Sequence, residues 1–301
     1  NRFKSTGTLA RPYPGQTTAI GNVGCAAVLA YNTALDLTGY SGWNNLVDGM
    51  SNGIIGHNSD LSVAQFNFKN IQPDAAYILM PVDANGSGIV AIGGSSDQNL
   101  KQVGNGKEAQ PSFQNCKWGI YTRAMNTSSR DNNMQGMGTG YRVDRARAST
   151  SITNNRVVAK RDGMVFNQNA GTANFWVKDN DITFGSPSFT MPISQYSGIV
   201  VADAHEGGAD SRIEDNKIFH TANTNAHAGI SLLAAKQWTV AGNQLTMAHN
   251  TMNRYGIANY GSSRLEVSCN TVTGAGTNYV QGQAAIYSNM GDRLNFTCNS
   301  L

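Results

Sequence analysis

The segment 229–245, GISLLAAKQWTVAGNQL, begins with Gly-Ile and ends with Asn, one variable residue and Leu. The same two marks recur in 256–272, GIANYGSSRLEVSCNTV, and in 285–301, AIYSNMGDRLNFTCNSL, where Ala replaces the Gly. In all three segments the first residue precedes the Asn by 14 positions. Repetition at a fixed period of this length is typical of a solenoid, in which each repeat packs only on its neighbours.

The motif of Asn followed two positions later by an aliphatic residue recurs throughout the C-terminal half of the chain. An Asn followed two positions later by a branched aliphatic residue occurs six times, at spacings of 25, 36, 27, 27 and 29 residues: Asn155, Asn180, Asn216, Asn243, Asn270 and Asn299. We expect these Asn to lie at one corner of the coil in left-handed backbone conformation, which Asn tolerates. Their amides can then hydrogen-bond from repeat to repeat as a structural ladder.

Three short strand-like segments fit into each later repeat; after Gly229 they are 230–233, 238–240 and 244–247. The 33 Gly residues and a charged fraction of only 14% suit stacked strands joined by tight turns. Because parallel strands favour right-handed crossovers, the pattern predicts an all-β chain. The expected fold is a right-handed, single-stranded parallel β-helix of eight to ten rungs.

Residues 1–45 do not fit the repeat, and we expect them to form an irregular or short helical cap or lead-in segment. The β-helix is expected over 46–301. Leu301 falls inside a repeat mark, so we expect the coil either to continue in a longer chain or to stack on a neighbouring β-helix segment of the same or another chain.

Charge and hydropathy exclude two classes of partner. The net charge is only +3 and no run of Lys or Arg exceeds two residues, which argues against nucleic acid. No stretch of 18 apolar residues is present, so no membrane-spanning helix is expected.

Two of the four cysteines, Cys269 and Cys298, share one repeat position. Adjacent rungs lie roughly 4.8 Å apart, which a disulfide accepts. In-register side chains point the same way, however, so we expect a reduced, inward-facing pair and leave the disulfide as the alternative.

The repeated pattern of Val-Ser-Cys-Asn and Phe-Thr-Cys-Asn, together with Gly-Ile-Tyr at 119–121, resembles the sequences of right-handed parallel β-helix proteins of the bacterial secreted and surface type. The likeness covers about residues 50–301. It implies an extracellular or cell-surface module, structural or adhesive, that contacts a polysaccharide or cell-surface glycan along one wall. The same fold hosts lyases, epimerases, glycosidases and phage tailspikes, so fold alone does not choose among them.

One turn is enlarged and rich in titratable groups. From Gly198 to Asn216 there are 18 residues, against 14 in the later repeats. Within this turn Asp203-Ala-His205-Glu206 resembles the Asp-Pro-His-Glu/Asp motif of mannuronan C5-epimerases, which are β-helix enzymes. The chain departs from that motif at Ala204, and the sequence leaves open whether it is an enzyme.

The epimerase resemblance implies that Asp203 and His205 act as acid and base, assisted by Glu206. Arg212 would neutralise a uronate carboxylate, and His227 would approach from the next rung. The alternative function is therefore a polysaccharide lyase or C5-epimerase acting on an acidic polysaccharide. The same oxygen donors, Asp203, Glu206 and Asp210, could instead hold Ca²⁺, although no known metal-loop spacing is present, and a solvated polar loop also fits.

A second candidate site is the arginine-rich segment 123–161. If Gly119 and Gly140 begin equivalent strands, the side chains of Tyr121 and Arg142 stack outward on one wall. Arg123 then lies over Asp144, and Arg145 belongs to the same cluster of positive charge. An aromatic ring beside guanidinium groups suits a saccharide, and a salt-bridged rung surface is the alternative.

Overall fold

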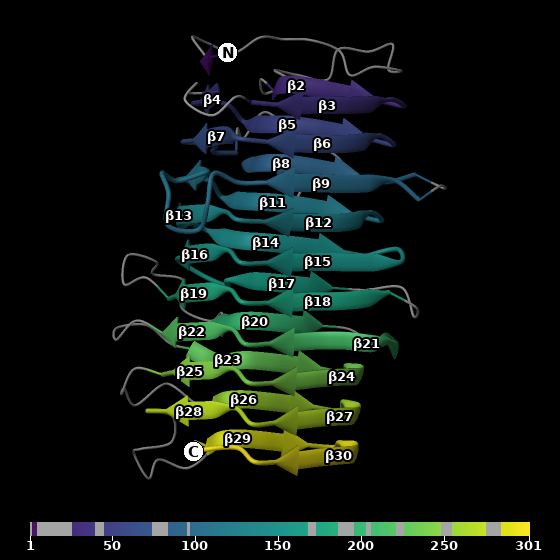
Figure 1. The fold of residues 1–301 in the computed structure, drawn as a ribbon, viewed down its shortest axis with the longest axis vertical. Helices are drawn as coiled ribbons and strands as arrows, with labels where there is room; N and C mark the ends of the chain where they lie inside the picture. Colours follow the sequence, from purple (N-terminus) through teal and green to yellow (C-terminus); the bar gives the residue numbers. More distant parts are fainter. Residues whose placement is uncertain are drawn as a thin grey trace.

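The computed structural model describes residues 2–4, 26–39, 45–73, 84–94, 97–167, 173–185, 196–202, 206–220, 226–247, 255–274 and 284–301. In these ranges the chain forms three parallel sheets of ten strands each. Figure 1 shows the three sheets, here called A, B and C, as three columns of stacked arrows. The expected right-handed parallel β-helix is confirmed.

Each rung runs through one strand of sheet B, then sheet C, then sheet A. Sheet B contains β2 (Ala26–Tyr31), β5 (Asn52–His57), β8 (Ser87–Ile92), β11 (Trp118–Arg123), β14 (Thr139–Asp144), β17 (Met164–Asn167), β20 (Tyr196–Ala202), β23 (Ala226–Leu233), β26 (Tyr255–Tyr260) and β29 (Ala284–Asn289). Sheet C contains β3 (Ala34–Thr38), β6 (Asp60–Ala64), β9 (Asn99–Val103), β12 (Asn126–Arg130), β15 (Ser149–Thr153), β18 (Asn174–Lys178), β21 (Glu206–Glu214), β24 (Lys236–Ala241), β27 (Ser263–Ser268) and β30 (Asp292–Thr297). Sheet A contains β1 (Arg2–Lys4), β4 (Asn45–Asp48), β7 (Phe66–Lys69), β10 (Phe113–Gln114), β13 (Asn133–Met137), β16 (Arg156–Ala159), β19 (Asp181–Phe184), β22 (Lys217–His220), β25 (Gln244–Thr246) and β28 (Thr271–Thr273).

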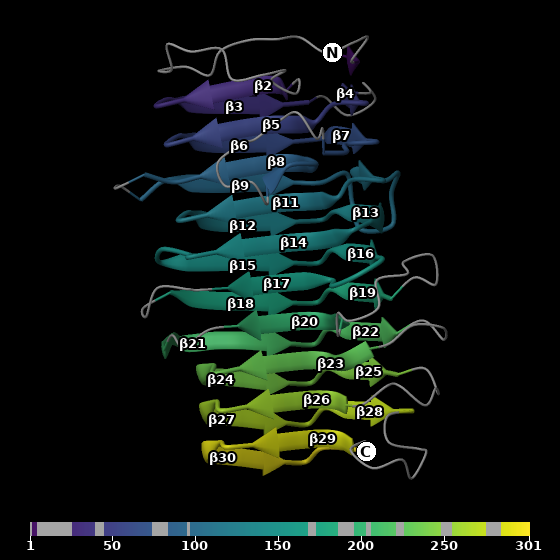
Figure 2. The ribbon, with the colours of Figure 1, turned by 180° about the vertical axis from the view of Figure 1, so that it is seen from behind.

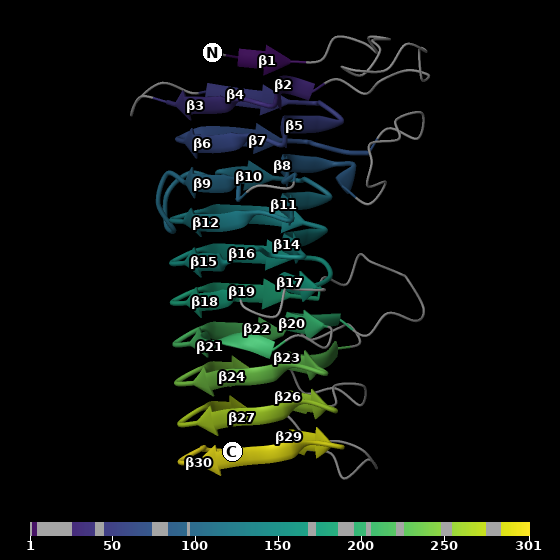
Figure 3. The same cartoon turned by 90° about the vertical axis from the view of Figure 1, so that its right-hand side faces the viewer.

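The rungs stack in one continuous pile, seen from behind in Figure 2 and from the side in Figure 3. Alternate side chains of each strand point inward, as the pleat requires. The aliphatic residues of the Asn repeat form one such inward column on sheet A, in register from rung to rung: Val157, Ile182, Ile218, Leu245 and Val272. The interior is therefore a stack of equivalent apolar positions.

The asparagine ladder is present, and it includes one more residue than the repeat predicted. Each ladder Asn donates both its backbone N–H and its Nδ2 to Oδ1 of the next one, at 2.9–3.0 Å. The ladder begins at Asn132 and continues through the six predicted residues to Asn299. From Asn132 to Asn270 these side chains are fully buried.

The prediction that the ladder Asn adopt left-handed conformation is wrong. Positive φ belongs to the residue that precedes each of them: Asp131, Asn154, Asp179, Asp215, Gly242, Cys269 and Cys298, with φ between 52° and 66°. One left-handed residue redirects the chain at the corner. The following Asn then points inward, where its amide is shielded from water.

The Gly-Ile motif and the Asn-x-aliphatic motif of the repeat contact each other in the fold. In five successive rungs the glycine near the start of the sheet B strand packs against the aliphatic residue two positions after the ladder Asn: Gly140, Gly163, Gly198, Gly229 and Gly256. A Cβ added at Gly140 would lie 2.5 Å from Val157, and one added at Gly198 would lie 2.5 Å from Ile218. Glycine is favoured at these five positions because the branched side chain fills the space that a Cβ would take.

Strands begin earlier in the chain than residue 46. β2 and β3 pair with β5 and β6, so residues 26–38 already belong to the coil. Residues 5–25, where a cap was expected, lie outside the described ranges. Within the part that is described, no helix is long and apolar enough to cross a membrane.

The expectation of a reduced, inward-facing cysteine pair is also wrong. Cys269 and Cys298 form a disulfide, with their Cα atoms 4.6 Å apart. Both residues are exposed, because they occupy the left-handed corner position that points away from the interior. The two sulfurs consequently meet on the outer surface and join the last two rungs.

Candidate functional site

The predicted pairing on the outer face of sheet B is confirmed. β11 and β14 place Tyr121 beside Arg142 and Arg123 beside Asp144. The Tyr121 hydroxyl donates to Asp144 Oδ2 at 2.8 Å, and Arg142 Nε donates to both Asp144 oxygens at 3.1 and 3.2 Å. The Arg142 guanidinium also lies 5.4 Å from the centre of the Trp118 ring and 5.7 Å from that of Tyr121.

The aromatic rings of this cluster are closed to solvent. Tyr121 is 0% exposed and Trp118 only 6%. Tyr121 packs with Ile55, Ala84 and Val90 in a small hydrophobic cluster on this face. Burial, with the neighbouring Asp144 carboxylate as the second cause, raises the pKa of Tyr121 far above its ordinary value. The Tyr121 ring face is therefore not available to stack on a saccharide.

The other predicted arginines of this segment have different surroundings. The Asp144 carboxylate accepts hydrogen bonds from Tyr121 and Arg142. Arg123 lies beside Asp144 in the register of β11 and β14. Arg145 is an exposed corner residue with φ 55°. Nη2 of Arg147 donates to the carbonyl oxygen of Gly94 at 2.5 Å. These contacts fit a salt-bridged, hydrogen-bonded rung surface.

The enlarged turn is described only in part. Asp203 and His205 lie outside the described residues, and the side chain of Glu206 is not described. The backbone of Glu206 begins β21 and pairs with Lys236, while Ser211 pairs with Trp238. Between these two pairs β21 advances by five residues and β24 by two, so the extra residues of β21 form a bulge.

Arg212 is engaged by carboxylates of its own strand. Its Nη1 lies 3.2 Å from Glu214 Oε1, and its Nη2 lies 3.8 Å from Asp210 Oδ1. The three residues alternate along β21 and share the outer face of sheet C. The repeat did not single out Glu214, which gives Arg212 its shorter ion pair.

His227 lies on another wall. It belongs to β23 of sheet B, whereas Arg212 belongs to β21 of sheet C. Its ring stacks on Tyr260 at 5.3 Å and meets Tyr255 edge-on at 5.5 Å. The structure therefore places His227 in an aromatic cluster and does not bring it together with Arg212.

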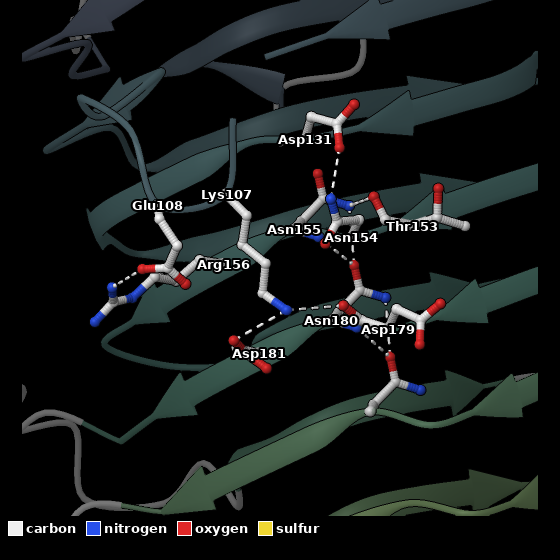
Figure 4. Close-up of polar contacts among 11 residues, drawn as sticks. Lys107, Glu108, Asp131, Thr153, Asn154, Asn155, Arg156, Asp179, Asn180 and Asp181 are labelled. Atoms are coloured by element: carbon white, nitrogen blue, oxygen red, sulfur yellow. Dashed lines mark hydrogen bonds and ion pairs between the residues drawn. The ribbon is translucent and has the colours of Figure 1, made fainter. Parts of the chain in front are cut away.

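A charged loop crosses sheet A. Residues 104–112 connect β9 to β10, and Figure 4 shows Lys107 and Glu108 reaching from this loop to later rungs. Lys107 Nζ lies 3.0 Å from Asp181 Oδ2, and Arg156 Nη1 lies 3.1 Å from Glu108 Oε2. These two ion pairs hold the loop before β10 against β16 and β19, and they have a structural role.

Trp176 is a surface residue that repeat counting could have identified. Positions three and five before a ladder Asn face inward, as do Val177 and Phe175 before Asn180. Trp176 lies four positions before the ladder residue Asn180, so its side chain points outward from β18 and is 45% exposed. Trp238 is five before its ladder Asn and is buried against Phe175, with ring centres 5.1 Å apart.

Two of the surface hollows lie near the two ends of the described coil. One of about 480 Å³ lies at the last rung and is lined by Ile286, Phe296 and Leu301, among others. The other, of about 380 Å³, lies at the first rungs of sheet C beside Asp36, Asp60 and Lys101. Neither hollow contains a residue of the predicted sites.

No three His, Cys, Asp or Glu side chains gather around a metal-sized space in the described ranges. The proposed Ca²⁺ ligands Asp203 and Glu206 are not covered by that statement, because their side chains are not described. Neither a protein-family model, nor a curated protein, nor a solved structure matches this chain.

Proposed function

We propose that this chain is an extracellular structural or adhesive β-helix module that contacts a polysaccharide or cell-surface glycan along one wall. The observation that carries the proposal is the commitment of the candidate charged groups to contacts within the chain. Arg142 and Tyr121 converge on Asp144, and Arg212 is held by Glu214 and Asp210. Groups engaged in this way stabilise a wall.

The exposed disulfide supports an extracellular or cell-surface location. Cys269 and Cys298 are joined on the outer surface of the last two rungs. Disulfides persist in oxidising compartments and are rare in the reducing cytosol. A neighbouring β-helix segment is a further proposed partner, since the last described rung carries the exposed apolar residues Phe296, in β30, and Met290, in the turn between β29 and β30.

One observation favours the alternative, a polysaccharide lyase or C5-epimerase. The bulge between Glu206 and Ser211 interrupts an otherwise regular wall. Bulges are common next to active sites, where they redirect a side chain. In this alternative Asp203 and His205 carry the acid–base chemistry on an acidic polysaccharide.

Incubation with alginate, pectate and glycosaminoglycans, together with a panel of neutral polysaccharides, tests both functions. Absorbance of the unsaturated uronate and the uronate NMR signals report turnover, and retention on the immobilised polymers reports binding. The module predicts binding to at least one glycan with no turnover by the unaltered protein. Turnover that the variant His205→Ala abolishes would contradict the proposal and establish the enzyme.

A further inference from the structure

The outer face of sheet C contains a polar grid with a single exposed tryptophan at its centre. Outward positions of adjacent strands are in register, with Trp176 of β18 between Ser151 of β15 and Arg212 of β21. The neighbours of Trp176 along β18 are Asn174 and Lys178, about 6.6 Å away on either side. The grid, here called the Trp176 face, comprises Ser149, Ser151, Thr153, Asn174, Trp176, Lys178, Asp210, Arg212 and Glu214.

The ring of Trp176 is accessible, and its surroundings are held in place. Trp176 is 45% exposed, whereas Trp118 and Trp238 are 6% and 2% exposed. The strands beneath it are fixed by the parallel ladders of β15, β18 and β21. Arg212 is oriented by Glu214 at 3.2 Å, so the polar groups around the ring need little reorganisation to bind a ligand.

The charges of the Trp176 face are balanced. Lys178 pairs with Asp215 at 3.3 Å, and this ion pair raises the pKa of the Lys178 ammonium. Arg212 is matched by Glu214 and Asp210. A polyanion therefore meets no unpaired cation in this grid. A ligand with many hydroxyl groups and no charge fits better, because carboxylates and hydroxyls accept or donate hydrogen bonds around an apolar ring.

We propose that the Trp176 face binds neutral saccharides, with a sugar ring stacked on Trp176 and its hydroxyl groups hydrogen-bonded to the flanking polar side chains. The inference rests on the proposed glycan-contacting function and specifies its wall and its ligand class. It moves the contact from sheet B, where Tyr121 is buried, to sheet C. It also favours neutral glycans over the uronates that the enlarged turn suggested.

The test uses retention in native gels that contain xylan, mannan, mixed-linkage β-glucan, soluble starch, alginate or pectate. The unaltered protein is expected to be retarded by at least one neutral polymer, with little change when salt is raised, because no net charge drives the binding. Trp176→Ala is expected to weaken that binding about tenfold or more. Phe219→Ala is the matched control, since Phe219 is 46% exposed on sheet A of the next rung.

The possible outcomes separate the inference from the function beneath it. Binding of a neutral polymer that Trp176→Ala removes and Phe219→Ala preserves supports both. Binding that survives Trp176→Ala, or binding of alginate and pectate alone, overturns the inference and leaves the glycan-contacting module standing. Failure to bind any polymer overturns both, and circular dichroism of each variant verifies that the fold is intact.

Discussion

At the scale of the residue, a buried amide can connect three rungs. Asn216 Oδ1 accepts the N–H and Nδ2 of Asn180, at 3.0 and 2.9 Å. Its own Nδ2 donates to Asn243 Oδ1 at 2.9 Å and to the Val177 carbonyl at 2.8 Å. Every polar atom of this buried side chain is paired, which is the condition under which a polar group in a core stabilises it.

The substitution Asn216→Ala should therefore destabilise the folded protein. It leaves the backbone N–H of Asn180 and one of its two Nδ2 hydrogens without an acceptor in the interior, while the other Nδ2 hydrogen keeps the Ile152 carbonyl. The free energy of unfolding should fall by about 2–4 kcal/mol. Urea denaturation followed by circular dichroism measures the loss. Asn295→Ala, at an exposed position of β30, serves as control and should change stability by less than about 0.5 kcal/mol. Equal stability of the two variants would show that the ladder is not a major contributor.

The carboxyl of Asp162 should give a pH-dependent effect. Burial raises its pKa above the ordinary 3.8, partly offset by the Ser197 N–H at 3.0 Å and by Arg161. The folded protein holds this proton more tightly than the unfolded chain does, so the carboxyl favours folding below its raised pKa and disfavours it as the pH rises. Asp162→Asn should stabilise the protein at pH 7, with the gain shrinking as the pH falls toward 4.

Thermal unfolding between pH 4 and pH 7 checks this prediction. Asp292→Asn is the matched control, because the Asp292 side chain is 78% exposed. The control should show no comparable trend with pH. A gain that is constant across this range, or a loss of stability at pH 7, would contradict a charge-burial cost at Asp162.

At the scale of the element, two connections hold strands that are distant in sequence. The loop 104–112 fastens β10 to β19 through Lys107, which contacts both the Asp181 carboxylate and the Asp179 carbonyl at 3.0 Å. The disulfide joins the ends of β27 and β30. Repeat spacing left the disulfide only as an alternative and did not predict the ion pairs of the loop, because both depend on where a turn directs its side chains.

The two ion pairs of the loop should differ in strength. The Lys107 side chain is only 20% exposed and has two partners, whereas the Glu108 side chain is 73% exposed. Lys107→Ala should lower the free energy of unfolding by about 1 kcal/mol, and Glu108→Ala by less than about 0.5 kcal/mol, since solvent screens exposed pairs. The opposite order in urea denaturation would show that the loop is not held by Lys107.

Thiol counting tests the disulfide. Burial raises the pKa of the Cys116 thiol to about 12, so this thiol should not react in the folded protein. In a Cys25→Ser variant, unfolding without reductant should release one reactive thiol, and unfolding with reductant should release three. Three thiols without reductant would mean that Cys269 and Cys298 are not joined.

At the scale of the whole molecule, the repeat predicted what depends on periodicity. The solenoid, the Asn column and the pairing of Tyr121 with Arg142 follow from spacing alone, because equivalent positions must stack. The burial of Tyr121 could not be predicted in the same way. Its neighbours Ala84 and Ile55 come from other rungs and from a connection outside the repeat, so only the tertiary structure brings them together.

The candidate sites were harder to predict for the same reason. A repeat fixes which wall a residue faces but not what lies on that wall. Arg212 and His227 are close in sequence, yet they belong to sheets C and B. Trp176 was identifiable by counting from Asn180, whereas its balanced charges depend on the ion pairs of β21 and of Lys178.

The most direct test of the stacked coil is a disulfide placed two repeats earlier than the native one. Asp215 and Gly242 occupy the same left-handed corner position as Cys269 and Cys298, on adjacent rungs. Asp215→Cys with Gly242→Cys should form a crosslink detectable by mass spectrometry, whereas Asp179→Cys with Gly242→Cys, two rungs or about 9.6 Å apart, should not. A crosslink in the second pair, or none in the first, would contradict the rung-by-rung stacking on which the function and the Trp176 face depend.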